Sequence, residues 1–129
     1  MAHTQLFRVI LPVSRIEEAT DYYSAVLGQP GKRISPGRHY FGCGNVILAC
    51  FDPRADGDSW DATPNSGHVY FSVEDLDVCF DRVGRLQNGA ILRPIEIQPW
   101  GERSFYCVDP FENKLCFVDQ RTLFTAGLI

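Results

Sequence analysis

The sequence predicts an α+β domain built from two similar modules. Residues 8–17 align without a gap on residues 68–77, and both segments alternate apolar and polar side chains before a turn. Such alternation is typical of a half-buried strand, and the turn leads into a helix. A supersecondary unit that occurs twice in so short a chain indicates a pseudo-symmetric domain. The matched apolar pairs are Val9 and Val69, Leu11 and Phe71, Val13 and Val73, and Ile16 and Leu76.

The first module is expected to begin with a strand over residues 6–13, followed by a helix that ends near Leu27. Ser14, alone or together with Arg15, is expected to cap this helix, because a short polar side chain accepts a hydrogen bond from the first unpaired N–H groups. Gly28 is typical of a helix C-cap, since glycine adopts the left-handed conformation without strain.

A loop and a hairpin are expected to complete the first module. Residues 29–38 contain two prolines and two glycines, which predict a loop. Residues 39–43 and 46–51 read as strands, and Gly44-Asn45 between them favours a tight turn.

The second module is expected to repeat this order. Pro94 should interrupt one of its strands, because proline cannot donate to the hydrogen-bond ladder. Each module therefore reads β-α-β-β, and an extra strand is expected in each. The predicted elements are a strand over residues 68–73, a helix from Leu76 to about Leu86, and strands over residues 91–98, 103–108 and 114–119.

A single domain is expected to span residues 1–129, because the chain is long enough to bury a core without disulfides or metals. The segment between the modules is rich in Asp, Gly, Pro, Ser and Asn, which is typical of a linker. The expected boundaries are module one at about 5–53, the linker at about 54–66, module two at about 67–120, and an apolar tail at 121–129.

Composition excludes several classes of function. The formal net charge is −4 and no Lys/Arg-rich run occurs, which argues against nucleic-acid binding. No apolar run approaches the length of a membrane span, and the first residues lack the pattern of a signal peptide. The five cysteines are odd in number and form no C-x-x-C pair, which favours free thiols. We therefore expect a cytoplasmic protein with no membrane or nucleic-acid partner.

Three stretches carry a resemblance to a known family. They are Val9-x-Leu11-x-Val13 with Ala19-Thr20-Asp21-Tyr22-Tyr23 and Val26-Leu27-Gly28, then Gly67-His68-Val69-Tyr70-Phe71-x-Val73-Glu74-Asp75-Leu76, and finally Trp100-Gly101-x-Arg103-x-Phe105-Tyr106-x-x-Asp109-Pro110-x-x-Asn113-x-Leu115. In this order and spacing they resemble the glyoxalase/bleomycin resistance/extradiol dioxygenase superfamily, also called vicinal oxygen chelate proteins. The resemblance implies two βαβββ modules whose sheets curl into a cup, and a homodimer.

The resemblance also implies where a metal would bind. In metal-dependent members, the ligands are the first residue of each opening strand and an acid late in each module. Here these positions match Arg8, His68 and Cys116, while residues 46–51 contain neither a carboxylate nor a histidine. Because a guanidinium does not bind a divalent cation, we expect that the usual metal site is lost and that no cofactor is bound.

The expected function is therefore binding of a small aromatic or anionic molecule in an aromatic-lined cup. Arg8 and His68 are the expected polar anchors, and His68 is also the candidate acid or base if a reaction occurs. Alternatively, Arg8 could form a structural ion pair with Glu102 or Asp119. The candidate ligand-binding residues are Arg8, Phe41, His68, Trp100, Arg103, Tyr106 and Cys116.

A metal-dependent alternative stays open. Cys50-Phe51 in the first module resembles Cys116-Phe117 in the second, so His68, Cys50 and Cys116 could form a Cys2His set for a divalent metal such as zinc. This set depends on strand register, because a slip of one residue turns Cys50 to the other face. Such a protein would be a lyase, isomerase or dioxygenase of the glyoxalase type.

Overall fold

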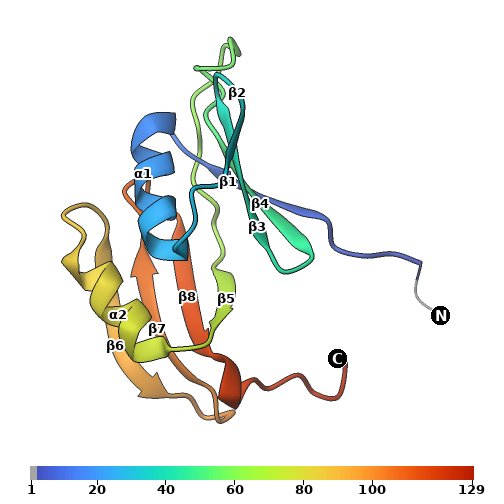
Figure 1. Cartoon of the computed structure of the whole chain (residues 1–129), viewed down its shortest axis with the longest axis vertical. Coiled ribbons are helices and arrows are strands. Elements are labelled where there is room, and N and C mark those ends of the chain that lie inside the picture. The colour runs from blue at the N-terminus through green and yellow to red at the C-terminus, as the bar shows by residue number, and fades with distance from the viewer. Residues whose placement is uncertain (1–2) are drawn as a thin grey trace. The chain divides into compact units, whose positions relative to one another are not determined.

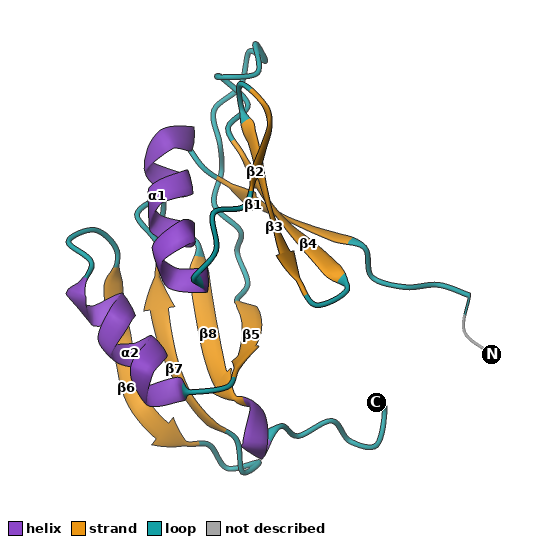
Figure 2. Cartoon of the chain, in the orientation of Figure 1, coloured by secondary structure: helices purple, strands orange, loops and turns teal. Residues whose placement is uncertain are grey.

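The computed structural model describes residues 3–129, which form two modules with the same order of elements (Figures 1 and 2). The chain divides into compact units at Asn65–Ser66. The first contains β1 (Arg8–Pro12), α1 (Ile16–Leu27), β2 (Lys32–Ser35), β3 (Arg38–Cys43) and β4 (Val46–Phe51). The second contains β5 (Val69–Val73), α2 (Leu76–Arg85), β6 (Ala90–Ile97), β7 (Arg103–Val108), β8 (Lys114–Asp119) and the 3-10 turn η1 (Gln120–Thr122). The predicted α+β class with two βαβββ modules is confirmed.

Both modules have the same sheet topology. The strand orders are β1-β4-β3-β2 and β5-β8-β7-β6, so the first strand of each module lies beside its last. The β1–β4 and β5–β8 pairs are parallel, and the other pairs are antiparallel. Each sheet is therefore mixed, and the repeat seen in the sequence is a repeat of topology. No helix within residues 3–129 is long and apolar enough to cross a membrane.

In the first module, one face of the sheet packs against α1. Tyr23 of α1 lies 6.3 Å from the ring of Phe41, and both side chains are fully buried. Leu11 and Cys50 are register partners on the same face and are also fully buried. Phe41 was expected to contact a ligand, and this assignment is wrong because its ring belongs to the core beneath α1.

The N-terminus of α1 is capped from a distant part of the chain. Arg15 occupies the N-cap position without a side-chain cap, so the predicted cap at Ser14 or Ser14-Arg15 is wrong. The buried carboxylate of Asp52 instead accepts a hydrogen bond from the Ile16 N–H at 3.2 Å. A carboxylate at this place also interacts favourably with the positive end of the helix dipole. At the other end, Gly28 adopts the predicted left-handed C-cap with φ 68°.

The extra strand expected in the first module lies where a loop was predicted. Residues 29–38 were predicted to be a loop, but β2 pairs with β3 at the edge of the sheet. The strand has only four residues, and its register shifts between Arg33 and Ser35. Because so short and polar a strand carries no alternation of its own, the pairing with β3 determines its conformation.

In the second module, stacked aromatic rings form the core between the sheet and α2. Phe71, Phe117 and Phe105 come from three adjacent strands, and successive ring centroids lie 5.1 and 5.3 Å apart. Phe80 of α2 meets Phe105 edge-on at 5.1 Å. This stack fixes which face of the second sheet is turned toward the helix.

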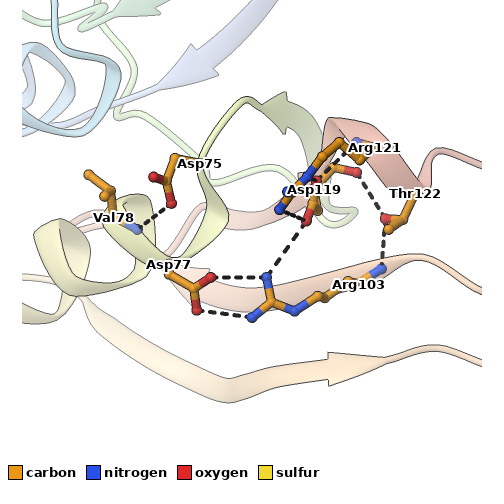
Figure 3. A network of polar contacts seen from close by, with 7 residues as sticks. All are labelled: Asp75, Asp77, Val78, Arg103, Asp119, Arg121 and Thr122. Atoms are coloured by element: carbon orange, nitrogen blue, oxygen red, sulfur yellow. Dashed lines mark hydrogen bonds and ion pairs between the residues drawn. The ribbon is translucent and has the colours of Figure 1, made fainter.

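A network of ion pairs joins α2 to the ends of β7 and β8 (Figure 3). Arg103 forms two hydrogen bonds with Asp77, at 2.9 and 3.2 Å, and lies 3.6 Å from Asp119. Asp119 is only 2% exposed and also accepts hydrogen bonds from Arg121, which lower the pKa of its carboxyl to about 2. Arg103, a residue predicted to contact a ligand, lies in this network, and its contact with a ligand stays a prediction.

We expect Asp52→Ala to lower the free energy of unfolding by roughly 0.5–2 kcal/mol, the usual loss when a helix N-cap is removed. Ser14→Ala is the matched control and should change the free energy little, because the Ser14 hydroxyl does not cap α1. Urea unfolding of both variants measures the difference. A larger loss in Ser14→Ala than in Asp52→Ala would contradict this account.

Asp119 predicts a specific acid dependence of stability. Its folded pKa lies below the ordinary value, so its stabilising effect is complete above about pH 4 and is lost as the pH falls toward 2. We expect Asp119→Asn to remove this part of the acid dependence in unfolding measured between pH 5 and 2. Asp81→Asn, which changes an exposed acid of α2, should keep it. An unchanged acid dependence in Asp119→Asn would show that the ion pairs of Asp119 with Arg121 and Arg103 contribute nothing to stability.

Candidate functional site

The candidate site lies on the open face of the second sheet, which we define as the face opposite α2. Strand geometry places alternate residues on opposite faces, so Tyr70 points away from α2 while its neighbour Phe71 joins the core. Cys116 of β8 pairs with Tyr70 on one side and with Tyr106 of β7 on the other. His68 precedes β5 and lies two residues before Tyr70, on the same face.

The open face carries a hollow of about 440 Å³ that is open to solvent. This volume lies within the range of small-molecule sites, roughly 300–1,000 Å³. Aromatic rings and three polar side chains line it, so the surface suits a ligand that has a flat apolar body and a polar group. The lining residues are His68, Tyr70, Leu92, Arg93, Gln98 and Tyr106.

His68, Tyr70 and Tyr106 form a three-ring cluster in this hollow. The ring of Tyr106 meets those of His68 and Tyr70 edge-on, with centroids 5.1 and 6.4 Å apart, and the His68 and Tyr70 centroids are separated by 6.3 Å. The hydroxyl oxygens of the two tyrosines lie 3.5 Å apart. This contact, together with burial, raises the pKa of Tyr106, so its phenol stays protonated and can donate a hydrogen bond.

Cys116 lies beneath the cluster and is fully buried. Side-chain hydrogen bonds join its thiol to Ser104 and Tyr106, and Ser104 accepts a hydrogen bond from the Gln98 amide at 3.3 Å. Burial raises the pKa of the Cys116 thiol, which keeps it neutral rather than nucleophilic. Cys116 therefore supports Tyr106 from below instead of facing the hollow.

Arg93 supplies the positive charge at the rim. It is exposed and forms an ion pair with Glu96 at 3.1 Å, which raises the pKa of Arg93. An ion pair between exposed side chains contributes little net free energy, because water screens both charges. The guanidinium of Arg93 can therefore exchange Glu96 for an anionic group of a ligand at small cost.

In the first module, Arg8 lies on the face of the sheet opposite α1. Its guanidinium carbon is 4.8 Å from the ring centroid of Phe7 and 5.2 Å from that of Tyr40. Among the described residues of the first module Arg8 forms no ion pair, and a pair with Glu102 or Asp119 of the second module stays a prediction. A cation held between aromatic rings can bind an anion without first losing a carboxylate partner.

Strand register establishes which residues of the two modules correspond. Ile10 pairs with Ala49 in the first sheet, as Tyr70 pairs with Cys116 in the second. Ala49 is therefore the counterpart of Cys116, and the predicted match with Cys50 is wrong by one residue. Cys50 is turned to the α1 face and is fully buried there.

These positions do not fit the divalent metal that the resemblance implies. Arg8 and Ala49 in the first module offer no metal ligand, and the second module offers His68 and a neutral thiol without a carboxylate. Over the described residues 3–129, no three His, Cys, Asp or Glu side chains gather in a way that could hold a metal ion.

One further candidate residue, Trp100, lies outside the hollow. Trp100 is half-exposed in the turn before β7, and its Nε1–H donates to Glu102 at 2.8 Å. Unlike the candidates His68 and Tyr106, Trp100 does not line the hollow.

Sequence reasoning did not select Tyr70, Leu92, Arg93 or Gln98. Tyr70 could have been found, because residues two apart on a strand share a face and His68 was already a candidate. Arg93 could not, since the register of β6 shifts on both sides of it. The predicted break at Pro94 is wrong, because β6 continues through this residue and only its register with β7 shifts between Arg93 and Glu96.

Comparison with known proteins agrees with this architecture. The family model of the Glyoxalase/Bleomycin resistance protein/Dioxygenase superfamily matches residues 2–117. No curated protein matches the chain significantly.

Solved structures show the same fold at low sequence identity. A glyoxalase-related enzyme from Fulvimarina pelagi is 18% identical, with a TM-score of 0.74 over 91% of this chain and 88% of the other. A glyoxalase/bleomycin resistance protein from Albidiferax ferrireducens T118 is 20% identical, with a TM-score of 0.72 over 88% and 96%. A lactoylglutathione lyase from Agrobacterium tumefaciens is 20% identical, with a TM-score of 0.68 over 92% and 95%.

These likenesses concern the fold, and the family model covers most of the chain. The resemblance seen in the sequence is thereby confirmed, and the chain belongs to the glyoxalase/bleomycin resistance protein/dioxygenase superfamily.

Proposed function

We propose that this chain binds a small planar aromatic anion in the hollow of the second sheet, without a metal ion. The observation that carries the proposal is the three-ring cluster of His68, Tyr70 and Tyr106 beside the cation of Arg93. Aromatic rings at these separations offer edges and faces to a flat ligand, which favours stacking over binding of a flexible chain. Gln98 adds an amide at the rim, which suits orientation of a polar group.

Charge favours an anion over a neutral aromatic ligand. Within residues 3–129 Arg93 pairs with the partly exposed carboxylate of Glu96, and the other polar groups of the hollow are uncharged or are histidine. Arg8 stays a proposed anion contact of the first module, because its guanidinium is stacked on rings and carries no ion pair within the described residues of that module. Binding of an aliphatic cation is disfavoured at both places.

Proton transfer by His68 is a second candidate function. Its imidazole is exposed in the hollow, where it contacts two tyrosine rings and makes no hydrogen bond within residues 3–129. A histidine that lies beside a bound ligand can act as general acid or base. The metal-dependent alternative has weaker support, because the donor set described above lacks carboxylates.

A homodimer also stays a proposal. The C-terminal tail exposes apolar side chains, which is typical of a segment that packs against another surface. These side chains are Leu123, Phe124, Leu128 and Ile129.

We expect a naphthalene carboxylate to bind the chain more tightly than the corresponding neutral carboxamide, because the carboxylate pairs with Arg93. Arg93→Gln should weaken carboxylate binding about tenfold, equivalent to about 1.4 kcal/mol, and should leave carboxamide binding unchanged. Isothermal titration calorimetry measures both. Arg85→Gln removes an exposed arginine of α2 and serves as the matched control.

Equal affinity of the wild type for the two naphthalene ligands would contradict the role of charge. Absence of binding by either ligand would contradict the proposed function itself.

We expect Zn²⁺, Mn²⁺, Fe²⁺ or Ni²⁺ to leave both the unfolding temperature and the carboxylate affinity unchanged. The reason is that His68 and the neutral Cys116 thiol provide too few ligands for tight binding. Elemental analysis of the untagged protein, purified without a chelator, measures the metal content. About one metal ion per chain, lost in His68→Gln, would instead support the metal-dependent alternative.

A further inference from the structure

We propose that the hydroxyls of Tyr70 and Tyr106 act together as two donors for a single anionic oxygen of the bound ligand. This inference rests on the proposed function and names its ligand class, a planar ring that carries a conjugated oxyanion such as a phenolate. The two hydroxyls come from β5 and β7, on either side of Cys116 in β8. They converge in the hollow from opposite sides of one strand.

The distance between the two hydroxyls suits a third oxygen. At 3.5 Å, their mutual contact is at the long limit of a hydrogen bond and is therefore weak. Two oxygens at this separation can each lie about 2.7 Å from a third oxygen, which is the usual length of an O–H···O bond. Replacing one weak contact by two charge-assisted hydrogen bonds favours the bound anion.

Tyr106 stays protonated, and its neighbours hold its hydroxyl in position to donate. The raised pKa of Tyr106 means that its phenol remains a donor at neutral and mildly alkaline pH. Its ring meets that of Tyr70 at 85° and that of His68 at 77°, so neighbouring rings restrict its rotation. The hydrogen bond to the buried Cys116, which Ser104 also contacts, supports the hydroxyl from below.

The first module provides an internal comparison. By register, Tyr40 pairs with Ala49 as Tyr106 pairs with Cys116, so Tyr40 is the counterpart of Tyr106. The counterpart of Tyr70 is Ile10, which has no hydroxyl. The first module therefore has one tyrosine at this place and cannot form the pair, which makes Tyr40→Phe a matched control.

The test uses para-nitrophenol as the probe, because its ionised form absorbs at longer wavelength than its neutral form. We expect the bound probe to ionise about one pH unit below the free probe, which is a tenfold preference for the phenolate. Tyr70→Phe and Tyr106→Phe should each reduce this shift, and the double variant should abolish most of it while the rings still stack. Tyr40→Phe should leave it unchanged.

Two comparisons separate this inference from other effects. Arg93→Gln should lower affinity for the phenolate but keep a shift that depends on the tyrosines, which distinguishes the donor pair from the rim charge. Para-nitroanisole has the same ring without an ionisable oxygen and reports ring binding alone.

Each outcome is decisive. If para-nitroanisole and para-nitrophenolate bind equally, or if the double variant keeps the full shift, the donor pair is wrong and aromatic binding stands. If neither probe binds the wild type, both the donor pair and the proposed function are overturned.

Discussion

Parallel pairing of the first strand with the last in each module is the constraint on which the rest of the structure depends. The β5–β8 register sets Phe71 beside Phe117 under α2 and Tyr70 beside Cys116 on the open face. A shift of one residue would exchange the two sets, placing the tyrosine in the core and the phenylalanine in solvent. The stacked phenylalanines therefore determine the location of the candidate site although none of them lines it.

The same register explains why this family member is poorly suited to a metal. It aligns Arg8 with His68 and Ala49 with Cys116, so a cation and a methyl group stand where the second module has an imidazole and a thiol. A fixed guanidinium and an uncharged thiol do not attract a divalent cation. Neutral hydroxyl donors and arginine side chains are the groups that recognise an anionic oxygen directly. Such groups lie on the open face of the second sheet and on the face of the first sheet opposite α1.

Much of the fold was predictable from local patterns, because alternation and helix signals act within a few residues. The strands around His68 and the hairpin at Gly44-Asn45 were found in this way, whereas the cap on α1 was not, since Asp52 is 36 residues from Ile16. The site was only partly predictable. His68 and Tyr106, two of the residues predicted to bind a ligand, line the hollow, but the pairing that buries Phe41 and turns Arg93 to the rim is set by strand register.

The most direct test of the central claim is side-chain NMR of protein labelled with carbon-13 at tyrosine and histidine rings, during titration with a naphthalene carboxylate. The account predicts that the signals of His68, Tyr70 and Tyr106 shift together and saturate with one dissociation constant, while those of Tyr22 and Tyr23 in α1 stay unchanged. Saturating ligand that leaves all three signals of the open face unmoved would contradict the account.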